Sequence, residues 1–146
     1  MRMKIRGLSQ PDERKSLLEG PYLARVVRFE PAGHAANPCR AATFLVLDPG
    51  PYSGRYVRTR LYCYERALWK LRWFLRDFGY DYGLMAAEEL DDREVVGLEG
   101  VIRLAFWGKD GQRRLDVQGF APKEEWQELS ERMGAERPAV VVQAEA

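Results

Sequence analysis

The chain has 146 residues and a mass of 16.9 kDa, which is the size of one domain, and its hydrophobic fraction of 46% is enough to build one core. No apolar run approaches the roughly 18 residues of a membrane span, and the basic N-terminus lacks the apolar segment of a signal peptide, so we expect a cytoplasmic protein without a membrane partner. Cys39 and Cys63 form no CxxC pair and His34 is the single histidine, so we expect reduced thiols and no metal site.

The net charge of +1 hides an uneven distribution along the chain. Residues 21–80 carry ten basic and four acidic side chains, a net charge of +6, whereas residues 81–100 carry one basic and seven acidic, a net charge of −6. Arginine outnumbers lysine by 18 to 5, and arginine offers a planar fork for phosphate and a flat face that stacks on bases. A GC-rich genome would explain this number of arginines equally well, but it would not explain their positions.

The first half of the chain predicts an arm and three strands. Gly7 and Pro11 interrupt residues 1–19, which we expect to form a loosely attached arm with one helical turn around residues 12–18. Gly20 and Pro21 then mark the entry to the domain. Strands are predicted at residues 22–29, 41–47 and 55–63, separated by a loop at 31–38 and a proline- and glycine-rich turn at 48–54.

The second half begins with a change of period. Leu68, Leu71, Leu75 and Phe78 form the stripe of an amphipathic helix over residues 65–79, and Gly79 stands at the position of a C-cap. The remaining predicted elements are a short helix at 84–92, a long strand at 95–107, a turn at 108–111, a strand at 113–120, a closing helix at 122–133 and a tail whose residues 139–142 could add an edge strand.

Three strands, a helix and a hairpin follow the order of the OB-fold, a five-stranded Greek-key barrel that often binds oligonucleotides or oligosaccharides. We therefore predict a mainly β protein with such a barrel over residues 20–122, a helix between its third and fourth strands, an arm at 1–19 and a C-terminal helix and tail at 123–146. An α+β sheet is the main alternative.

Side-chain alternation along the third predicted strand suggests the function. Val57, Thr59 and Leu61 suit the interior, which leaves an aromatic, two cations and a second aromatic on the opposite face. Such a face suits single-stranded nucleic acid, because arginines neutralise phosphates and aromatic rings stack on bases. A solvated strand face is the alternative. With the other strands in their expected registers, the predicted nucleic-acid-binding residues are Arg25, Tyr56, Arg58, Arg60, Tyr62, Arg103, Trp107 and Arg114.

Two of these registers carry their own expectations. On the first strand either Arg25 or Arg28 faces outward, and we favour Arg25, with Tyr22 and the two alternate positions after it inside and Arg28 near the strand end. On the fourth strand, Phe106 is predicted to point inward with the alternate positions before it, so that Arg103 faces outward.

Other groups of residues give weaker indications of function than the third strand does. Trp69 and Trp73 are spaced i, i+4 on the predicted helix, where they cap the core or form a partner interface, since tryptophan is enriched in interface hot spots. The acidic residues between 88 and 94 are interpreted as a solvated face rather than a metal site. No GxSxG, P-loop, HExxH or GxGxxG motif is present, so we expect neither an enzyme nor a cofactor, and a nuclease is a minor alternative.

The segments GPYLARV, FLVL, GRYVRTRLYCY, ALWKLRWFLRDFGYD, LDDREVVGLEGVIRLAF and RLDVQGFAP follow one order. Over about residues 20–122 this order resembles a phage and prophage family of small proteins, designated a domain of unknown function, whose members look like single-stranded-DNA-binding OB-fold proteins of replication and recombination. The resemblance implies single-stranded DNA binding and supplies no individual site residue. The chain ends in PAVVVQAEA, so the acidic tail through which many such proteins recruit partners is not expected here.

The sequence therefore predicts a protein that binds single-stranded DNA with little sequence preference and serves replication or recombination. A homo-oligomer is compatible with this prediction. The alternative is a protein-interaction or oligomerisation module that binds no nucleic acid, with Trp69, Trp73 and the C-terminal helix as its contact surface.

Overall fold

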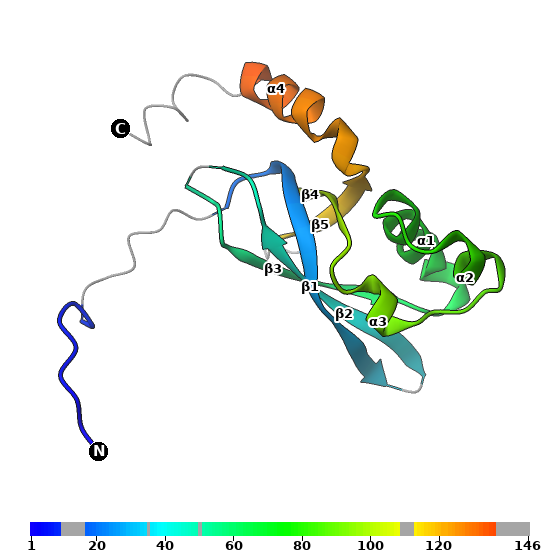
Figure 1. The fold of residues 1–146 in the computed structure, drawn as a ribbon, viewed down its shortest axis with the longest axis horizontal. Coiled ribbons are helices and arrows are strands. Elements are labelled where there is room, and N and C mark those ends of the chain that lie inside the picture. Colours follow the sequence, from blue (N-terminus) through cyan, green and yellow to red (C-terminus); the bar gives the residue numbers. More distant parts are fainter. Residues whose placement is uncertain (10–16, 35, 50, 109–112, 137–146) are drawn as a thin grey trace.

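The structure, a computed structural model, describes residues 1–9, 17–34, 36–49, 51–108 and 113–136. It is built on one antiparallel sheet of five strands in the spatial order β3-β2-β1-β4-β5, which confirms the predicted mainly β class. Helices α1, α2 and α3 gather at one side of this sheet, and α4 lies apart from them (Figure 1). The strands are β1 (Gly20–His34), β2 (Asn37–Val46), β3 (Tyr56–Tyr62), β4 (Glu99–Trp107) and β5 (Arg114–Ala121).

Strand β1 is the centre of the sheet. Its first part, from Gly20 to Arg25, pairs with β4, whereas the part from Ala24 to His34 pairs with β2. The register shifts between Val26 and Arg28, so that Val27 is an extra residue in the ladder, as in a β-bulge. This shift decides which arginines of β1 share a face.

The two edge strands of the sheet approach one another. The hydroxyl of Thr59 on β3 donates a hydrogen bond of 2.8 Å to Oδ1 of Asp116 on β5. Thr59 is buried, and Asp116 is half-buried although its strand register places it on the outer face. The sheet therefore curls until β5 lies beside β3. We call the concave, core-forming side its inner face and the opposite side its outer face.

Helix α1 covers the inner face at the end of β3. It spans Leu68–Asp77, follows the single-turn helix η1 (Glu65–Ala67) and buries Leu71, Phe74 and Leu75, which confirms the predicted stripe. Gly79, with φ of 80°, ends the helix as predicted, because a positive φ is easily reached without a side chain.

The core is aromatic where α1 meets the sheet. The ring of Phe74 lies 5.7 Å from that of Phe44 on β2, 4.8 Å from Phe78 and 5.3 Å from Phe120 on β5. Burial of one such ring stabilises a fold by about 1.5–3 kcal/mol, so this cluster fixes α1 against β2 and β5. On the first strand Tyr22 is buried as predicted, and its exposed neighbour Arg25 faces outward.

The predicted loop at residues 31–38 is wrong. Strand β1 continues to His34 and β2 begins at Asn37, with Pro31 paired in register with Arg40. On the β4 side, Val26 still exchanges backbone hydrogen bonds with Leu98 and Gly97, but beyond it no described strand pairs with β1. Proline is tolerated on such an edge because a missing N–H breaks no central ladder.

The predicted helix at residues 84–92 is also wrong, because two shorter helices replace it. They are α2 (Tyr82–Ala86) and α3 (Asp92–Val95), and β4 starts at Glu99 rather than at Val95. Aspartates fix both starts: the carboxylate of Asp81 accepts from the backbone N–H of Leu84 at 2.8 Å, and that of Asp91 accepts from the N–H of Arg93 at 3.0 Å.

The burial predicted for Phe106 is wrong: its register puts it on the same face as Leu104, but the residue is 46% exposed. Strand β4 runs past the core at this point, where the backbone N–H of Phe106 donates to the carboxylate of Glu19 at 2.8 Å. The predicted closing helix is confirmed as η2 (Lys123–Glu125) leading into α4 (Trp126–Glu136). The edge strand predicted at 139–142 lies outside the described residues, as does most of the helical turn predicted around 12–18.

Candidate nucleic-acid interface

Strand β3 alternates as the sequence predicts. Val57, Thr59 and Leu61 are buried, whereas the four residues between and beside them are exposed. The outer face of β3 therefore presents, in order, Tyr56, Arg58, Arg60 and Tyr62. Tyr56 is 66% exposed, so its ring is open to solvent rather than folded over a neighbouring loop.

Arg28 joins this face from two strands away. The β-bulge at Val27 puts Arg28 in register with Thr43 of β2, which is itself in register with Arg58. Adjacent strands lie about 4.8 Å apart, so the backbones of the two arginines are separated by roughly 10 Å across Thr43. Sequence analysis placed Arg28 near the strand end and missed it, because simple alternation puts residues 25 and 28 on opposite faces.

The arginines of this outer face differ in whether a carboxylate neutralises their charge. Among the described residues, no ion pair forms with Arg28, Arg58 or Arg60, so their guanidinium groups are available. Arg25 is different, because its Nε and Nη2 both donate to Oε2 of Glu99, at 2.8 and 2.7 Å. As far as the described residues show, Arg28, Arg58 and Arg60 on this face are available, whereas Arg25 is neutralised by Glu99.

The middle of this outer face is formed by small side chains of β2, which project less than those of β1 and β3. Ala41 and Thr43 are its residues on β2, and they lie in register between β1 and β3. Ala41 is only 1% exposed although its register points it outward, which means that longer neighbouring side chains cover it. Its cross-strand neighbours are Arg60 on β3 and Glu30 on β1, both exposed. The long side chains therefore stand on either side of a floor of small residues.

Trp107 and Arg114 lie together at the hairpin of β4 and β5. They are direct cross-strand partners, and Trp107 is 62% exposed. Arg114 stands two residues before Asp116, whose hydrogen bond to Thr59 sets β5 beside β3. These two predicted residues are therefore next to the β3 face around the curled sheet.

Arg103 is not part of that group. It pairs in register with Gly119 of β5 and with Pro21 at the start of β1, and it lines a groove of about 400 Å³ beside α4. A side-chain carbon built on Gly119 would lie 3.0 Å from the Trp73 ring and 3.1 Å from Nε of Arg103. The structure thus brings Arg103 close to Trp73 of α1.

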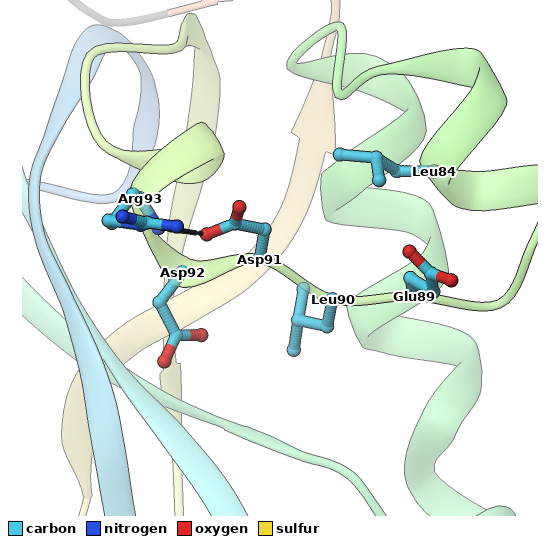
Figure 2. A pocket seen from close by; sticks show the side chains of 6 residues that line it. All are labelled: Leu84, Glu89, Leu90, Asp91, Asp92 and Arg93. Carbon is cyan, nitrogen blue, oxygen red and sulfur yellow. Dashed lines mark hydrogen bonds and ion pairs between the residues drawn. The ribbon is translucent and has the colours of Figure 1, made fainter.

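The acidic segment, residues 81–100, lines a separate, open surface pocket of about 630 Å³ between α2 and α3, with Leu84 and Leu90 in its wall (Figure 2). Its aspartates already have partners. Asp91 caps α3 and lies 3.5 Å from Nε of Arg93, and Asp92 accepts from Nε of Arg40 at 2.8 Å. Within the described ranges, no three His, Cys, Asp or Glu side chains are grouped so that they could hold a metal ion.

Two titratable groups near the site are shifted by burial. Burial lowers the pKa of Lys70 on α1, against the opposing effect of Asp116, and its Nζ donates to the carbonyl of Val117 at 2.6 Å. Burial likewise raises the pKa of the Cys63 thiol, although nearby Arg40 acts in the other direction. Cys39 and Cys63 are both free thiols, as expected.

A comparison with protein-family models and a search of curated proteins both found no match to this chain. In the part of the chain that the structure describes, no helix is both long enough and apolar enough to cross a membrane.

Proposed function

We propose that the protein binds single-stranded DNA with little sequence preference, through the outer face of β3 and its neighbours, and that it serves replication or recombination. The observation that carries the proposal is the line of Tyr56, Arg58, Arg60 and Tyr62, which Arg28 widens to a second strand. The assignment to replication or recombination comes from the family resemblance of the sequence.

The strand connections support an OB-fold as the scaffold. In that fold the first strand pairs with both the second and the fourth, a helix follows the third strand, and the barrel closes between the third and the fifth. The pairing of β1 with β2 and β4, the position of α1 and the Thr59–Asp116 hydrogen bond agree with each of these points. Oligonucleotides bind OB-folds on the face of strands 2 and 3, bounded by the loops after strands 1 and 4. The proposed residues of β3 occupy that face, and Trp107 and Arg114 flank the second loop.

The residue types suit a strand of unspecified sequence. Each base offers a ring face that a tyrosine can stack on, for about 1–3 kcal/mol per base, and each available arginine can neutralise a phosphate. Neither interaction depends on the identity of the base. Binding should therefore weaken as salt rises, with a slope that reports the number of phosphates contacted.

The test is fluorescence anisotropy of a labelled oligothymidylate titrated with the protein at several salt concentrations. Wild-type protein should bind at micromolar concentration or below. The double variant Arg58→Ala/Arg60→Ala should lose most of this affinity and reduce the salt slope by about 1.4, since each single-strand phosphate contact contributes about 0.7.

Arg93→Ala is the matched control, because Arg93 is an arginine on the acidic helix α3 with a side chain that is 91% exposed. It should bind DNA as the wild type does. Absence of wild-type binding at low salt, or equal loss in the control and the double variant, would refute the proposal. A protein-interaction module that binds no nucleic acid would then be the favoured function. A molecular mass that rises with protein concentration would support it.

A further inference from the structure

Trp69 on α1 is an exposed aromatic ring that lies beside a second tryptophan ring. Its ring stacks on that of Trp73, with centroids 6.3 Å apart and an angle of 27° between the planes, yet its side chain is 54% exposed. Trp73 is held in turn by the ring of Phe120, which meets it edge-on at 5.7 Å. The exposed part of the Trp69 ring is therefore presented on a fixed support.

Cations surround this pair. Arg103 approaches Trp73 across Gly119, where even one added carbon would lie within 3.1 Å of both side chains. On the helix itself Arg72 and Arg76 are exposed, and so is Arg66 on η1. Residues 65–77 carry four basic and two acidic side chains, and among the described residues Arg66, Arg72 and Arg103 form no ion pair.

The pair also lies beside the proposed DNA face. Strand β3 leads through Tyr62 and Tyr64, whose rings are 5.6 Å apart, directly into η1 and α1. Helix α1 packs against both β3 and β5, and Lys70 bonds the carbonyl of Val117 on β5. A strand that leaves the end of β3 therefore meets the cationic surface of α1 next.

We propose that Trp69, supported by Trp73 and by Arg103 beside the Trp73 ring, is a second base-stacking platform that extends the single-stranded DNA site from β3 onto α1. This inference rests on the proposed function. Charge selects the occupant, because an exposed ring among uncompensated arginines suits a polyanion with aromatic bases. The sequence pattern alone predicts a partner interface or a core cap for the two tryptophans.

The main experiment measures the affinity of Trp69→Ala for oligothymidylates of about 4 to 16 nucleotides, the range of OB-fold site sizes. On the longer oligomers the affinity should fall about 5- to 150-fold, the equivalent of roughly 1–3 kcal/mol for one stacked base. On the shortest oligomer that binds, which the β3 face alone can hold, the loss should be less than about twofold.

Trp69→Phe should keep most of the affinity, because a smaller ring still stacks, but it should lose part of the tryptophan quenching that DNA causes in the wild type. Gly119→Ala should weaken binding in the same direction as Trp69→Ala by displacing Trp73 and Arg103. Tyr82→Ala is the control, since Tyr82 is an aromatic residue 87% exposed on α2, in the acidic segment.

The platform is refuted if Trp69→Ala binds long oligomers as tightly as the wild type, or if its loss is the same at every length. The same set of measurements separates the two proposals. Wild-type binding that depends on Arg58 and Arg60 but not on Trp69 would leave the proposed function intact and remove the extension. No binding by the wild type would remove both, and Trp69-dependent self-association would then favour the interaction module.

Discussion

Substitution of Gly100 by alanine should destabilise the protein through one identifiable contact. Gly100 is buried on β4, and a Cβ there would lie 2.6 Å from both Cδ1 and Cε1 of Phe78. The backbone of Gly100 is not in the positive-φ region, so alanine meets no conformational obstacle. The effect of the substitution is therefore purely steric.

The magnitude follows from the freedom of the Phe78 ring. Carbon atoms pack best about 3.5–4.0 Å apart, so the ring has to retreat by roughly 1 Å. Phe78 is 3% exposed and lies against the rings of Phe44, Phe74 and Phe120, at 5.6, 4.8 and 6.0 Å, which blocks that movement. Overpacking of this kind costs about 1–3 kcal/mol, and we expect Gly100→Ala to lie in the upper half of that range.

Urea unfolding of a double-mutant cycle measures the contact. Phe78→Leu alone should destabilise by loss of packing, but Gly100→Ala should cost at least about 1 kcal/mol less in its presence. Gly97→Ala is the control: its φ is 97° and a Cβ there would meet open space, so its cost is one of backbone strain that Phe78→Leu leaves unchanged. Wild-type stability of Gly100→Ala, or strictly additive effects in the cycle, would show that the reasoning is wrong.

Three further outcomes are expected. Glu99→Gln removes the carboxylate that neutralises Arg25, so the affinity for single-stranded DNA should rise and the salt slope should steepen by up to about 0.7 in the anisotropy assay; an unchanged slope would contradict this. The folded-state pKa of Lys70 is below its ordinary value of 10.5, so the unfolded chain binds more protons in the window between the two values. The stability of the wild type relative to Lys70→Met, from urea titrations, should therefore rise with pH through that alkaline window and stay level below it. Burial raises the pKa of Cys63 above 9.0, so iodoacetamide should alkylate it slowly in the folded protein at neutral pH and faster only in the alkaline range, and rapid labelling at pH 7 would be inconsistent with the burial seen.

The outer face of β3 could be predicted because its pattern is unambiguous. Apolar or small polar residues alternate with aromatic and basic ones over the whole strand, so only one register buries the apolar set. The stripe of α1 was predictable for the same reason, since Leu71 and Leu75 repeat with the period of a helix.

The grouping of charges across strands was not predictable. Arg28 shares a face with Arg58 only because of the bulge at Val27, and a single sequence gives no sign of an extra residue in a ladder. Arg103 was expected beside the arginines of β3, but its neighbour is Gly119, a pairing that depends on how β4 meets β5. Alternation along one strand determines which face of the sheet a residue lies on. Which residues of other strands lie next to it there depends on the register between strands that are far apart in sequence.

The misassigned segments have local physical causes. The proline and glycine content of residues 31–38 is typical of a loop, yet an unpaired edge of β1 accommodates both residue types. Between residues 84 and 92 the composition favours a helix throughout, but the side chains of Asp81 and Asp91 cap two separate starts. Phe106 lies on the inward-facing side of β4 and is exposed nevertheless, because the strand extends beyond the end of the core.

The divided pairing of β1 has a consequence for the order of folding. Its ladder with β2 closes a tight hairpin, and β2 and β3 are joined by a short connection, so this meander forms from contacts that are near in sequence. In its ladder with β4 even the pair closest in sequence, Arg25 and Glu99, is 74 positions apart along the chain, so a far larger loop has to close. We therefore expect the β1–β4 pairing to form late in folding, after the arginine-bearing surface of β1, β2 and β3 has been assembled.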